Sequence, residues 1–312
     1  MVICSNCKKF PSVIELRYSR EFLCRRCFSR LFEKRVRKTI RVNHLLNQND
    51  KVAVGLSGGK DSVTLLKILH KLSKRAPKSK LIAISVDEGI HGYREKTLKI
   101  AKKICKELKV EHYVYTFKKE IGMTLDQMMK KSVAKRSPPA CSFCGVFRRK
   151  ILNEAARELK ANKLATGHNL DDEIQVTLMN FIRGDFDRIA RMGPEVGIIK
   201  DKKFIPRIKP LRECPEREVA IYAILNGFKA DGLQCPYAGE ALRTTIRDVI
   251  NEIEEKHPGS KFQMLKTTDR LIEILREQYK TDKKINECKN CGELTSRELC
   301  KACGIMKELN LT

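Results

Sequence analysis

Hydrophobic residues in the middle of the chain form short runs that alternate with longer stretches of helical spacing. The short runs are rich in β-branched residues, as buried strands are, and lie at residues 52–56, 81–86, 110–117 and 163–166. The longer stretches, with apolar residues every three or four positions, lie at residues 61–72, 94–108 and 147–159. This alternation predicts an α/β domain with a parallel sheet and helices on both faces.

Three more helices are predicted outside this region. Residues 30–41 place Leu31, Phe32, Val36 and Ile40 at helical spacing among Arg and Lys residues. Such a basic amphipathic helix suits a phosphate backbone, although a solvated linker helix would have the same pattern. Two further helices are expected at residues 242–255 and 267–279, separated by the Lys-His-Pro-Gly segment 256–259.

Cysteine spacing predicts two zinc sites. The chain has 13 cysteines and no export signal, which favours metal binding or catalysis over structural disulfides. Two Cys-x2-Cys pairs near each end can complete a tetrahedral S4 shell, whose metal would supply folding energy to segments too short for a core. Iron could replace zinc in such sites. The predicted ligands are Cys4, Cys7, Cys24 and Cys27 at one end, and Cys288, Cys291, Cys300 and Cys303 at the other.

A glycine-rich segment after the first strand of the central region predicts a nucleotide site. Gly58 and Gly59 allow the backbone to approach an anion, and amides at the start of the next helix would point at phosphate. The spacing of the Walker motif is absent. The predicted nucleotide-binding residues of this segment are Gly55, Leu56, Ser57, Gly58, Gly59, Lys60, Asp61 and Ser62.

The segment 166–173, Thr-Gly-His-Asn-Leu-Asp-Asp-Glu, combines a glycine turn, His168 and adjacent carboxylates at a helix start. Acidic residues in a first helical turn often only stabilise that turn. Beside ATP they could instead hold Mg²⁺, which prefers oxygen ligands together with phosphate. His168 fits a structural role and a site role equally well.

Five cysteines remain. Cys105 and Cys214 are expected to be structural, whereas Cys141, Cys144 and Cys235 lie in turn or loop sequences. Cys141 and Cys144 are predicted at the entrance to a helix, where the helix terminus would lower the thiol pKa. Nearby cations would act in the same direction; they are Lys135, Arg136, Arg148 and Arg149. Three thiolates are one short of a closed four-iron cluster, which would leave one iron open for sulfur.

The charge of the chain favours a polyanionic partner. Lys and Arg outnumber Asp and Glu by 64 to 38, a formal net charge of +26. Such an excess supports nucleic-acid binding through counterion release, although solvated surface lysines could account for part of it. No apolar run is long enough to span a membrane, and the N-terminus has no signal segment, so a cytoplasmic location is expected.

Ser-Gly-Gly-Lys-Asp-Ser after a strand resembles the PP-loop (N-type ATP pyrophosphatase) superfamily, whose members adenylate a substrate oxygen. With 138–145 (PPACSFCG), 166–173 (TGHNLDDE), 232–237 (GLQCPY) and the terminal cysteine pairs in that order, the whole chain resembles the tRNA 2-thiolation proteins of the TtcA/TtuA family. The resemblance implies a [4Fe-4S] cluster on Cys141, Cys144 and Cys235, and ATP with Mg²⁺ at the loop. It implies adenosine contacts at Ser85, Val86, Asp87, Gly167 and His168, beyond the carboxyl ends of strands.

The same resemblance suggests a domain order and partners. We expect an N-terminal zinc domain (1–30), a basic linker helix (31–50), a PP-loop catalytic domain (51–240), a helical segment (241–283) and a C-terminal zinc domain (284–312). Partners would be tRNA, a sulfur donor (a ubiquitin-like thiocarboxylate protein or sulfide) and a second copy in a homodimer. Arg148 stands where some members have Lys, and Arg remains protonated, so charge stabilisation is expected there instead of proton transfer.

The implied reaction is 2-thiolation of a tRNA uridine, at the wobble or the T-loop position. The uridine O2 would attack the α-phosphorus of ATP, and sulfur would then displace AMP at C2. Lys60 and Arg148 would stabilise negative charge, and Asp172 would hold metal or position the adenylate. Two alternatives remain: a persulfide–disulfide relay through Cys141 and Cys144 without iron, and a zinc-ribbon tRNA-binding adaptor with a degenerate nucleotide site.

Overall fold

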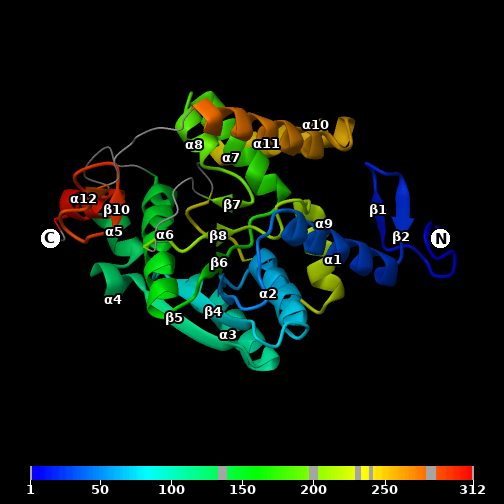
Figure 1. Cartoon of the computed structure of the whole chain (residues 1–312), viewed down its shortest axis with the longest axis horizontal. Helices are drawn as coiled ribbons and strands as arrows, with labels where there is room; N and C mark the ends of the chain where they lie inside the picture. The colour runs from blue at the N-terminus through cyan, green and yellow to red at the C-terminus, as the bar shows by residue number, and fades with distance from the viewer. Residues whose placement is uncertain are drawn as a thin grey trace.

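The centre of the protein is a six-stranded sheet, seen in a computed structural model that describes residues 2–132, 139–196, 203–228, 233–238, 242–278 and 286–310 (Figure 1). The strand order is β5-β4-β3-β6-β8-β7, and every neighbouring pair is parallel except β7 with β8. The strands are β3 Lys51–Gly55, β4 Lys80–Asp87, β5 Glu111–Thr116, β6 Lys163–Ala165, β7 Glu195–Val196 and β8 Arg207–Ile208. The predicted α/β fold with a mostly parallel sheet is confirmed.

Helices cover both faces of this sheet. Val52 and Val54 of β3 point into a core shared with α2 and α3, whereas Ala53 points into the core under α6. Alternate residues of a strand face opposite sides, and both sides of β3 are apolar, so the strand is buried between layers. The covering helices are α2 Lys60–Ser73, α3 Arg94–Leu108 and α6 Ala140–Glu158.

Three predicted helices begin earlier than expected. One of them, α1 Arg25–Val42, begins at Arg25 instead of 30. Helix α6 begins at Ala140, with Pro139 as its N-cap, so Cys141 and Cys144 lie in its first turns and not in a preceding turn. Gly145 weakens helix propensity, but burial of Phe143, Phe147 and their neighbours on one face of the helix overrides it. Helix α11 begins at Ser260 instead of 267, and position 279 lies outside the described residues.

A second group of helices packs beside the carboxyl ends of the strands. Helices α10 and α11 lie on α7 (Figure 1), where Ile246, Ile250 and Leu265 pack with Leu170 and Ile174. The group consists of α7 Leu170–Ile182, α8 Phe186–Ala190, α10 Leu242–Lys256 and α11 Ser260–Gln278, whereas α9 Glu216–Leu225 packs on α1 and α2. Two short helices at the end of β5, α4 Phe117–Ile121 and α5 Leu125–Ser132, pack with α6.

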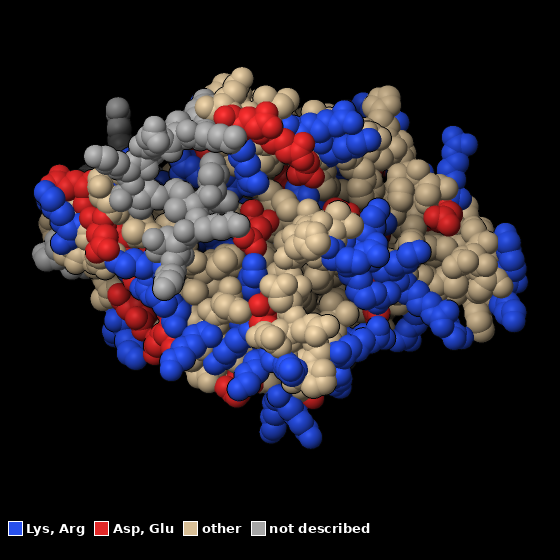
Figure 2. Space-filling model, in the orientation of Figure 1, with Lys and Arg blue, Asp and Glu red and all other residues tan. Residues whose placement is uncertain are grey.

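The two cysteine-rich segments lie at opposite ends of the molecule (Figure 1). The N-terminal one contains β1 Ile14–Leu16, β2 Glu21–Leu23 and the start of α1 Arg25–Val42. The C-terminal one contains β9 Asn286–Glu287, β10 Leu294–Thr295 and α12 Lys301–Glu308. Helix α1 buries Phe28, Phe32 and Val36, which confirms the predicted amphipathic helix, and Lys and Arg side chains gather over this region (Figure 2). Among the described helices, none has the length and apolar character required to cross a bilayer.

Candidate active site and metal sites

The loop between β3 and α2 has a conformation that only glycine tolerates at one position. Gly58 has a φ of +86°, and a Cβ atom there would lie 2.0 Å from the carbonyl oxygen of Thr97. The backbone N–H groups of Gly58, Lys60 and Asp61 have no hydrogen-bond acceptor among the described residues. Free amides at the start of a helix are suited to an anion such as phosphate.

Two serines hold the loop in this shape. The Ser62 hydroxyl donates to the Gly59 carbonyl oxygen at 3.0 Å and accepts from the Ser57 N–H at 3.1 Å. The two hydroxyls are 3.0 Å apart, and Ser57 also accepts from the Gly59 N–H. Because these bonds are within the loop, Ser57 and Ser62 preorganise it, and Ser62 is nearly buried.

Lys60 is held between two carboxylates. Its Nζ lies 2.7 Å from Glu216 on α9 and 3.2 Å from Asp61. Burial disfavours the charged ammonium, but the two carboxylates outweigh it and raise the pKa of Lys60. Burial raises the pKa of Asp61 against the effect of Lys60, and Asp61 accepts from Asn169 Nδ2 at 3.1 Å. The segment 166–173 is therefore attached to the loop.

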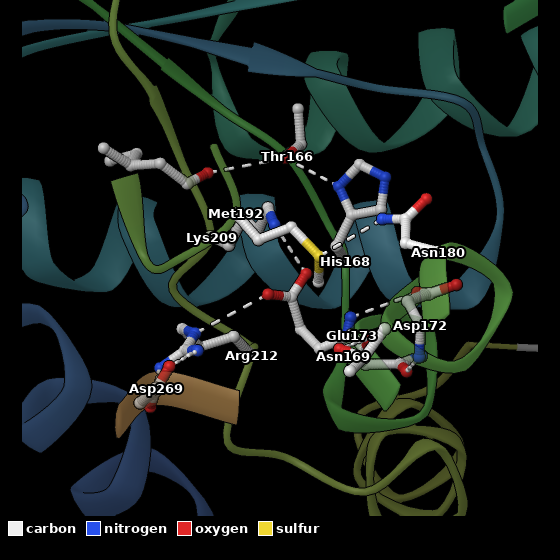
Figure 3. A network of polar contacts seen from close by, with 12 residues as sticks. Thr166, His168, Asn169, Asp172, Glu173, Asn180, Met192, Lys209, Arg212 and Asp269 are labelled. Carbon is white, nitrogen blue, oxygen red and sulfur yellow. Dashed lines mark hydrogen bonds and ion pairs between the residues drawn. The ribbon is translucent and has the colours of Figure 1, made fainter. Parts of the chain in front are cut away.

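The start of α7 combines helix capping with charge pairing (Figure 3). Asn169 and Asp172 form a capping box, and Arg243 of α10 binds Asp172 at 2.8 Å. A Cβ at Gly167 would lie 3.0 Å from the backbone of Asp61 and Ser62, so this turn touches the loop. The described residues contain no group of three carboxylates close enough to bind one ion.

His168 lies beside this turn, and its Nδ1 is 2.9 Å from the Thr166 hydroxyl. Burial of the ring by surrounding protein, together with nearby Lys209, lowers the pKa of His168 to about 3, although the residue keeps solvent access. His168 is therefore neutral at working pH.

The residues at the end of β4 lie beneath the loop. The buried Ser85 hydroxyl donates to the Leu56 carbonyl oxygen at 2.6 Å and contacts His112 Nε2 at 2.7 Å. Val86 is buried, and Asp87 accepts from the N–H of Gly89. The Ser85 side chain is thus engaged with protein, and it supports the loop from below.

The three remaining candidate cysteines come together at the N-terminal end of α6. Cys141 Sγ lies 3.7 Å from the carbonyl oxygen of Tyr237, in the segment that carries Cys235. Cys144 and Cys235 pack against one apolar cluster with Phe143 and Phe147. Cys105 and Cys214 are buried elsewhere, as expected for structural residues.

The expected lowering of the thiol pKa at the start of α6 is wrong for Cys144. Burial raises the pKa of Cys144 to about 11, and the opposing effect of Arg148 is smaller. Burial also raises the pKa of Cys235. The helix-terminus argument overlooked desolvation, because α6 packs closely around these thiols. Residues 135 and 136 lie outside the described residues.

The trio is more widely spaced than a site for a single ion. All four sulfur atoms of each terminal tetrad lie within 4.8 Å of one another, whereas Cys141, Cys144 and Cys235 form no such close group. Thiolates that bind different irons of one cluster are necessarily further apart than thiolates that share one ion. Each of the three is within electrostatic range of the others, in a largely apolar wall that would protect a cluster.

A chain of charged groups connects the loop with these thiols. Arg94 donates to the Ser57 carbonyl oxygen at 2.6 Å and pairs with buried Glu88 at 2.8 Å. Glu88 also lies 3.6 Å from Arg148, whose charge acts on Cys144 and Cys235. The loop and the thiols are therefore on one side of the sheet and share ionic contacts.

Both terminal tetrads fit a tetrahedral metal ion. Cys4, Cys7, Cys24 and Cys27 form one group, and Cys288, Cys291, Cys300 and Cys303 the other. Burial opposes ionisation of Cys4, but backbone N–H groups of Cys7 and Cys24 lower its pKa to about 6. The pKa of Cys288 is also lowered to about 6, by the backbone amides of Cys300 and Cys291. Amides directed at sulfur prepare thiolate ligands.

Sequence reasoning missed Glu216, Glu88 and Arg94. Glu216 follows Cys214-Pro215 at the start of α9, a position typical of an ordinary helix-capping carboxylate. Glu88 and Arg94 are separated by a turn that the apolar pattern does not reveal. Their roles depend on contacts between elements, which no local signal contains.

Comparisons with known proteins agree with this geometry. Residues 29–231 match a family described as a PP-loop domain. The chain is 36% identical to the tRNA 2-thiolation protein NcsA of Haloferax volcanii, covering 98% of each sequence. It is 34% identical to the tRNA-5-methyluridine(54) 2-sulfurtransferase of Pyrococcus horikoshii, covering 98% of this chain and 95% of the other. The chain is also similar to a solved structure, the U34-tRNA thiolase NcsA from Methanococcus maripaludis with its [4Fe-4S] cluster. The two sequences are 40% identical, and the structures superpose with a TM-score of 0.85 over 99% of this chain and 97% of the other.

Proposed function

Because this chain belongs to the family of PP-loop tRNA 2-thiolation proteins, we propose that it is an ATP-dependent sulfurtransferase that replaces the C2 oxygen of a tRNA uridine with sulfur. The observation that carries this proposal is the ionic connection from Ser57 through Arg94, Glu88 and Arg148 to the three thiols. It brings a phosphate-binding loop and a candidate sulfur centre into one site.

The target within tRNA is proposed to be the wobble uridine, position 34. The solved thiolase named for that position is 40% identical to this chain, compared with 34% for the relative named for position 54. Both relatives are covered almost completely, so identity alone favours position 34. The T-loop position is the alternative that nucleoside mapping would reveal.

ATP is proposed to bind with its phosphates at the amides of Gly58, Lys60 and Asp61. Gly55, Leu56 and Gly59 shape the turn, and the adenosine would lie near Val86, Asp87, Gly167 and His168, with Ser85 supporting the loop from below. Mg²⁺ would use one or two carboxylates and phosphate oxygens, and Asp61, Asp172 and Glu216 are the nearest candidates. Lys60 would exchange part of its carboxylate pairing for the negative charge of the phosphates.

Cys141, Cys144 and Cys235 are proposed to hold the [4Fe-4S] cluster. When bound, the cluster would supply an iron without a protein ligand as the place where sulfur is presented. Arg148 is placed to stabilise negative charge beside the uridine C2, and it stays protonated at working pH. Glu88 fixes the guanidinium of Arg148 and prevents it from moving towards the loop.

Zinc is proposed for both terminal tetrads, because a closed S4 shell with prepared thiolates suits structural zinc. The proposed partners are tRNA, a ubiquitin-like thiocarboxylate protein or sulfide as sulfur donor, and a second copy of the chain. A cytoplasmic location is proposed from relatives named as cytoplasmic tRNA 2-thiolation proteins. The domain order from residues 1–30 to 284–312 remains our expectation.

The test is anaerobic reconstitution with iron and sulfide, followed by assay of 2-thiouridine in unmodified tRNA. Separate Cys→Ser changes at 141, 144 and 235 should abolish thiolation and reduce bound iron, whereas Cys105→Ser is the matched control at a cysteine outside the site. Full activity of an iron-free preparation would support the persulfide relay instead. Absence of AMP formation from ATP with tRNA would support the adaptor.

A further inference from the structure

Five cations gather where α6, the end of the sheet and the C-terminal knuckle meet. They are Arg149 of α6, Arg207 of β8, Arg183 and Arg188 near α8, and Lys301 of α12, called here the junction cations. Arg188 pairs with Asp185 at 2.8 Å. The other four have no ion pair with any residue in the described ranges.

Three cations close to the junction on the same helix and knuckle are paired, which makes them suitable comparisons. Lys150 follows Arg149 in α6 and pairs with Glu154. Lys289 lies in the same knuckle as Lys301 and pairs with Glu298 at 2.5 Å. Arg157 at the end of α6 pairs with Glu293 of the knuckle at 2.9 Å. Arg149 and Lys301 therefore differ from these neighbours in having no carboxylate partner in the described ranges.

The junction cations act on one another electrostatically. Burial lowers the pKa of Arg207 to about 10, and the charge of Arg149 contributes to the same shift. Lys301 is within electrostatic range of Arg149, Arg183 and Arg188. These residues come from four segments, so their mutual repulsion is built by the fold and not by one basic run.

The junction borders the proposed sulfur centre. The guanidinium of Arg149 turns back over Gly145, with Nη1 3.2 Å from the position a Cβ would take there. Gly145 directly follows Cys144. Helix α12 packs on α6 (Figure 1), and Ser142 of α6 and Lys301 line one open hollow between them. A ligand bound to these cations would therefore lie next to the uridine site.

We propose that the junction cations bind consecutive phosphodiester groups of the tRNA strand that flank the target uridine, an inference that rests on the proposed function. Unpaired Arg and Lys from several segments suit a polyanion with charges spaced along a backbone. The triphosphate of ATP is a less suitable occupant, because the loop already offers free amides and Lys60 for it. The C-terminal knuckle is thereby part of the tRNA-binding surface, in addition to its structural role.

The test compares two double variants of the full-length, zinc-loaded protein. Arg149→Gln with Lys301→Gln removes two unpaired junction charges, and Lys150→Gln with Lys289→Gln removes two paired charges from the same helix and knuckle. Binding of unmodified tRNA is measured by filter binding over a salt series, without the reaction. The first variant should bind tRNA at least tenfold more weakly. The plot of log K against log salt concentration should also become less steep by up to about two units, because each lost phosphate contact reduces the slope by about 0.9.

The control variant should stay within about threefold of the wild type in affinity and keep its salt slope. ATP affinity, measured by calorimetry, should be unchanged in both variants. Equal tRNA binding by the two variants, or a loss of ATP binding in the first with tRNA binding kept, would overturn the inference. If the wild-type protein does not bind tRNA, the proposed function is overturned as well. If the wild type binds tRNA and the first variant binds it equally well, only this inference is overturned.

Discussion

At the level of single residues, the site depends on side chains that other side chains hold in place. Ser57 and Ser62 bind each other and the loop, Arg94 binds the Ser57 carbonyl, and Glu88 lies between Arg94 and Arg148. In the described structure each of these side chains has a hydrogen-bond or ion-pair partner. Preorganised groups of this kind lose little entropy when a charged substrate arrives.

Gly58→Ala should abolish ATP binding. An alanine at φ +86° is strained by roughly 1–2 kcal/mol, and its Cβ would overlap the Thr97 carbonyl oxygen, so the loop must shift. The control is Gly122→Ala, where φ is +88° and no atom lies within 4 Å of the Cβ position. Calorimetry should show lost ATP affinity for the first variant only. Equal ATP affinity in both would contradict a tight loop.

Glu88→Gln should reduce kcat for thiolation by about tenfold, because the neutral amide would no longer fix the Arg148 guanidinium, and small misplacements are costly in catalysis. The KM for ATP should rise by a smaller factor, because Arg94 keeps its hydrogen bonds to the carbonyl oxygens of Ser57 and Val86. Glu158→Gln, which replaces the carboxylate that accepts from Tyr115 by a neutral amide at the far end of α6, is the control. A parallel rise in the KM for ATP would show that Glu88 acts on the loop instead.

At the level of elements, hydrophobic periodicity predicted the strands and helices that have one clear apolar face. Helix α3 occupies residues 94–108, as expected, and β3, β4 and β6 differ by one or two residues. The start of α6 was misplaced because Cys141 and Cys144 suggested a turn. Helix α9 and strands β7 and β8 were not predicted, since two-residue strands and a nearly uniform helix give no periodic signal.

The candidate site was predictable where it depends on local motifs. The loop residues, both tetrads and the three thiols could all be named from spacing, and the tetrads are brought together as expected. What could not be foreseen is which charges meet across elements, such as Glu216 with Lys60 or Arg243 with Asp172. Those partners are distant in sequence and lie on faces that resemble ordinary solvated surface.

Lys261→Met should destabilise the helical layer beside the site. Lys261 is nearly buried and binds Asp171, which also accepts from the Glu216 N–H. Removing one partner of a buried pair leaves an uncompensated charge and typically costs about 3–5 kcal/mol. The free energy of unfolding in urea should fall by that order. Lys256→Met, which breaks the exposed pair with Glu252, is the control and should cost less than about 1 kcal/mol. Equal losses would contradict the proposed role of Lys261.

At the level of the whole molecule, the two knuckles are connected to the catalytic sheet differently. The N-terminal tetrad shares a continuous core with α1, α2 and β3, which includes Phe28 and Phe32. The C-terminal knuckle instead packs through Ala302 and Ile305 on the cluster that contains Phe143 and approaches Cys144. Loss of metal at the two ends should therefore have different consequences.

Cys288→Ser should release the metal ion proposed for the C-terminal tetrad and lower the iron content of the reconstituted protein by more than half. The reason is that a loosened knuckle exposes the first turns of α6, which carry Cys141 and Cys144. ATP affinity should stay within about twofold, because the loop lies away from α12. Metal analysis and calorimetry check both statements. A loss of ATP affinity equal to the loss of iron would contradict this division of roles.

The separation of the three candidate ligands along the chain has a consequence for biogenesis. Cys141 and Cys144 lie on α6, but Cys235 follows β8 and α9, after the last strand of the sheet. A ribosome must therefore have synthesised the entire sheet before the third sulfur exists. The cluster proposed for these thiols can therefore acquire its third protein ligand only late, after the chain has been synthesised past residue 235.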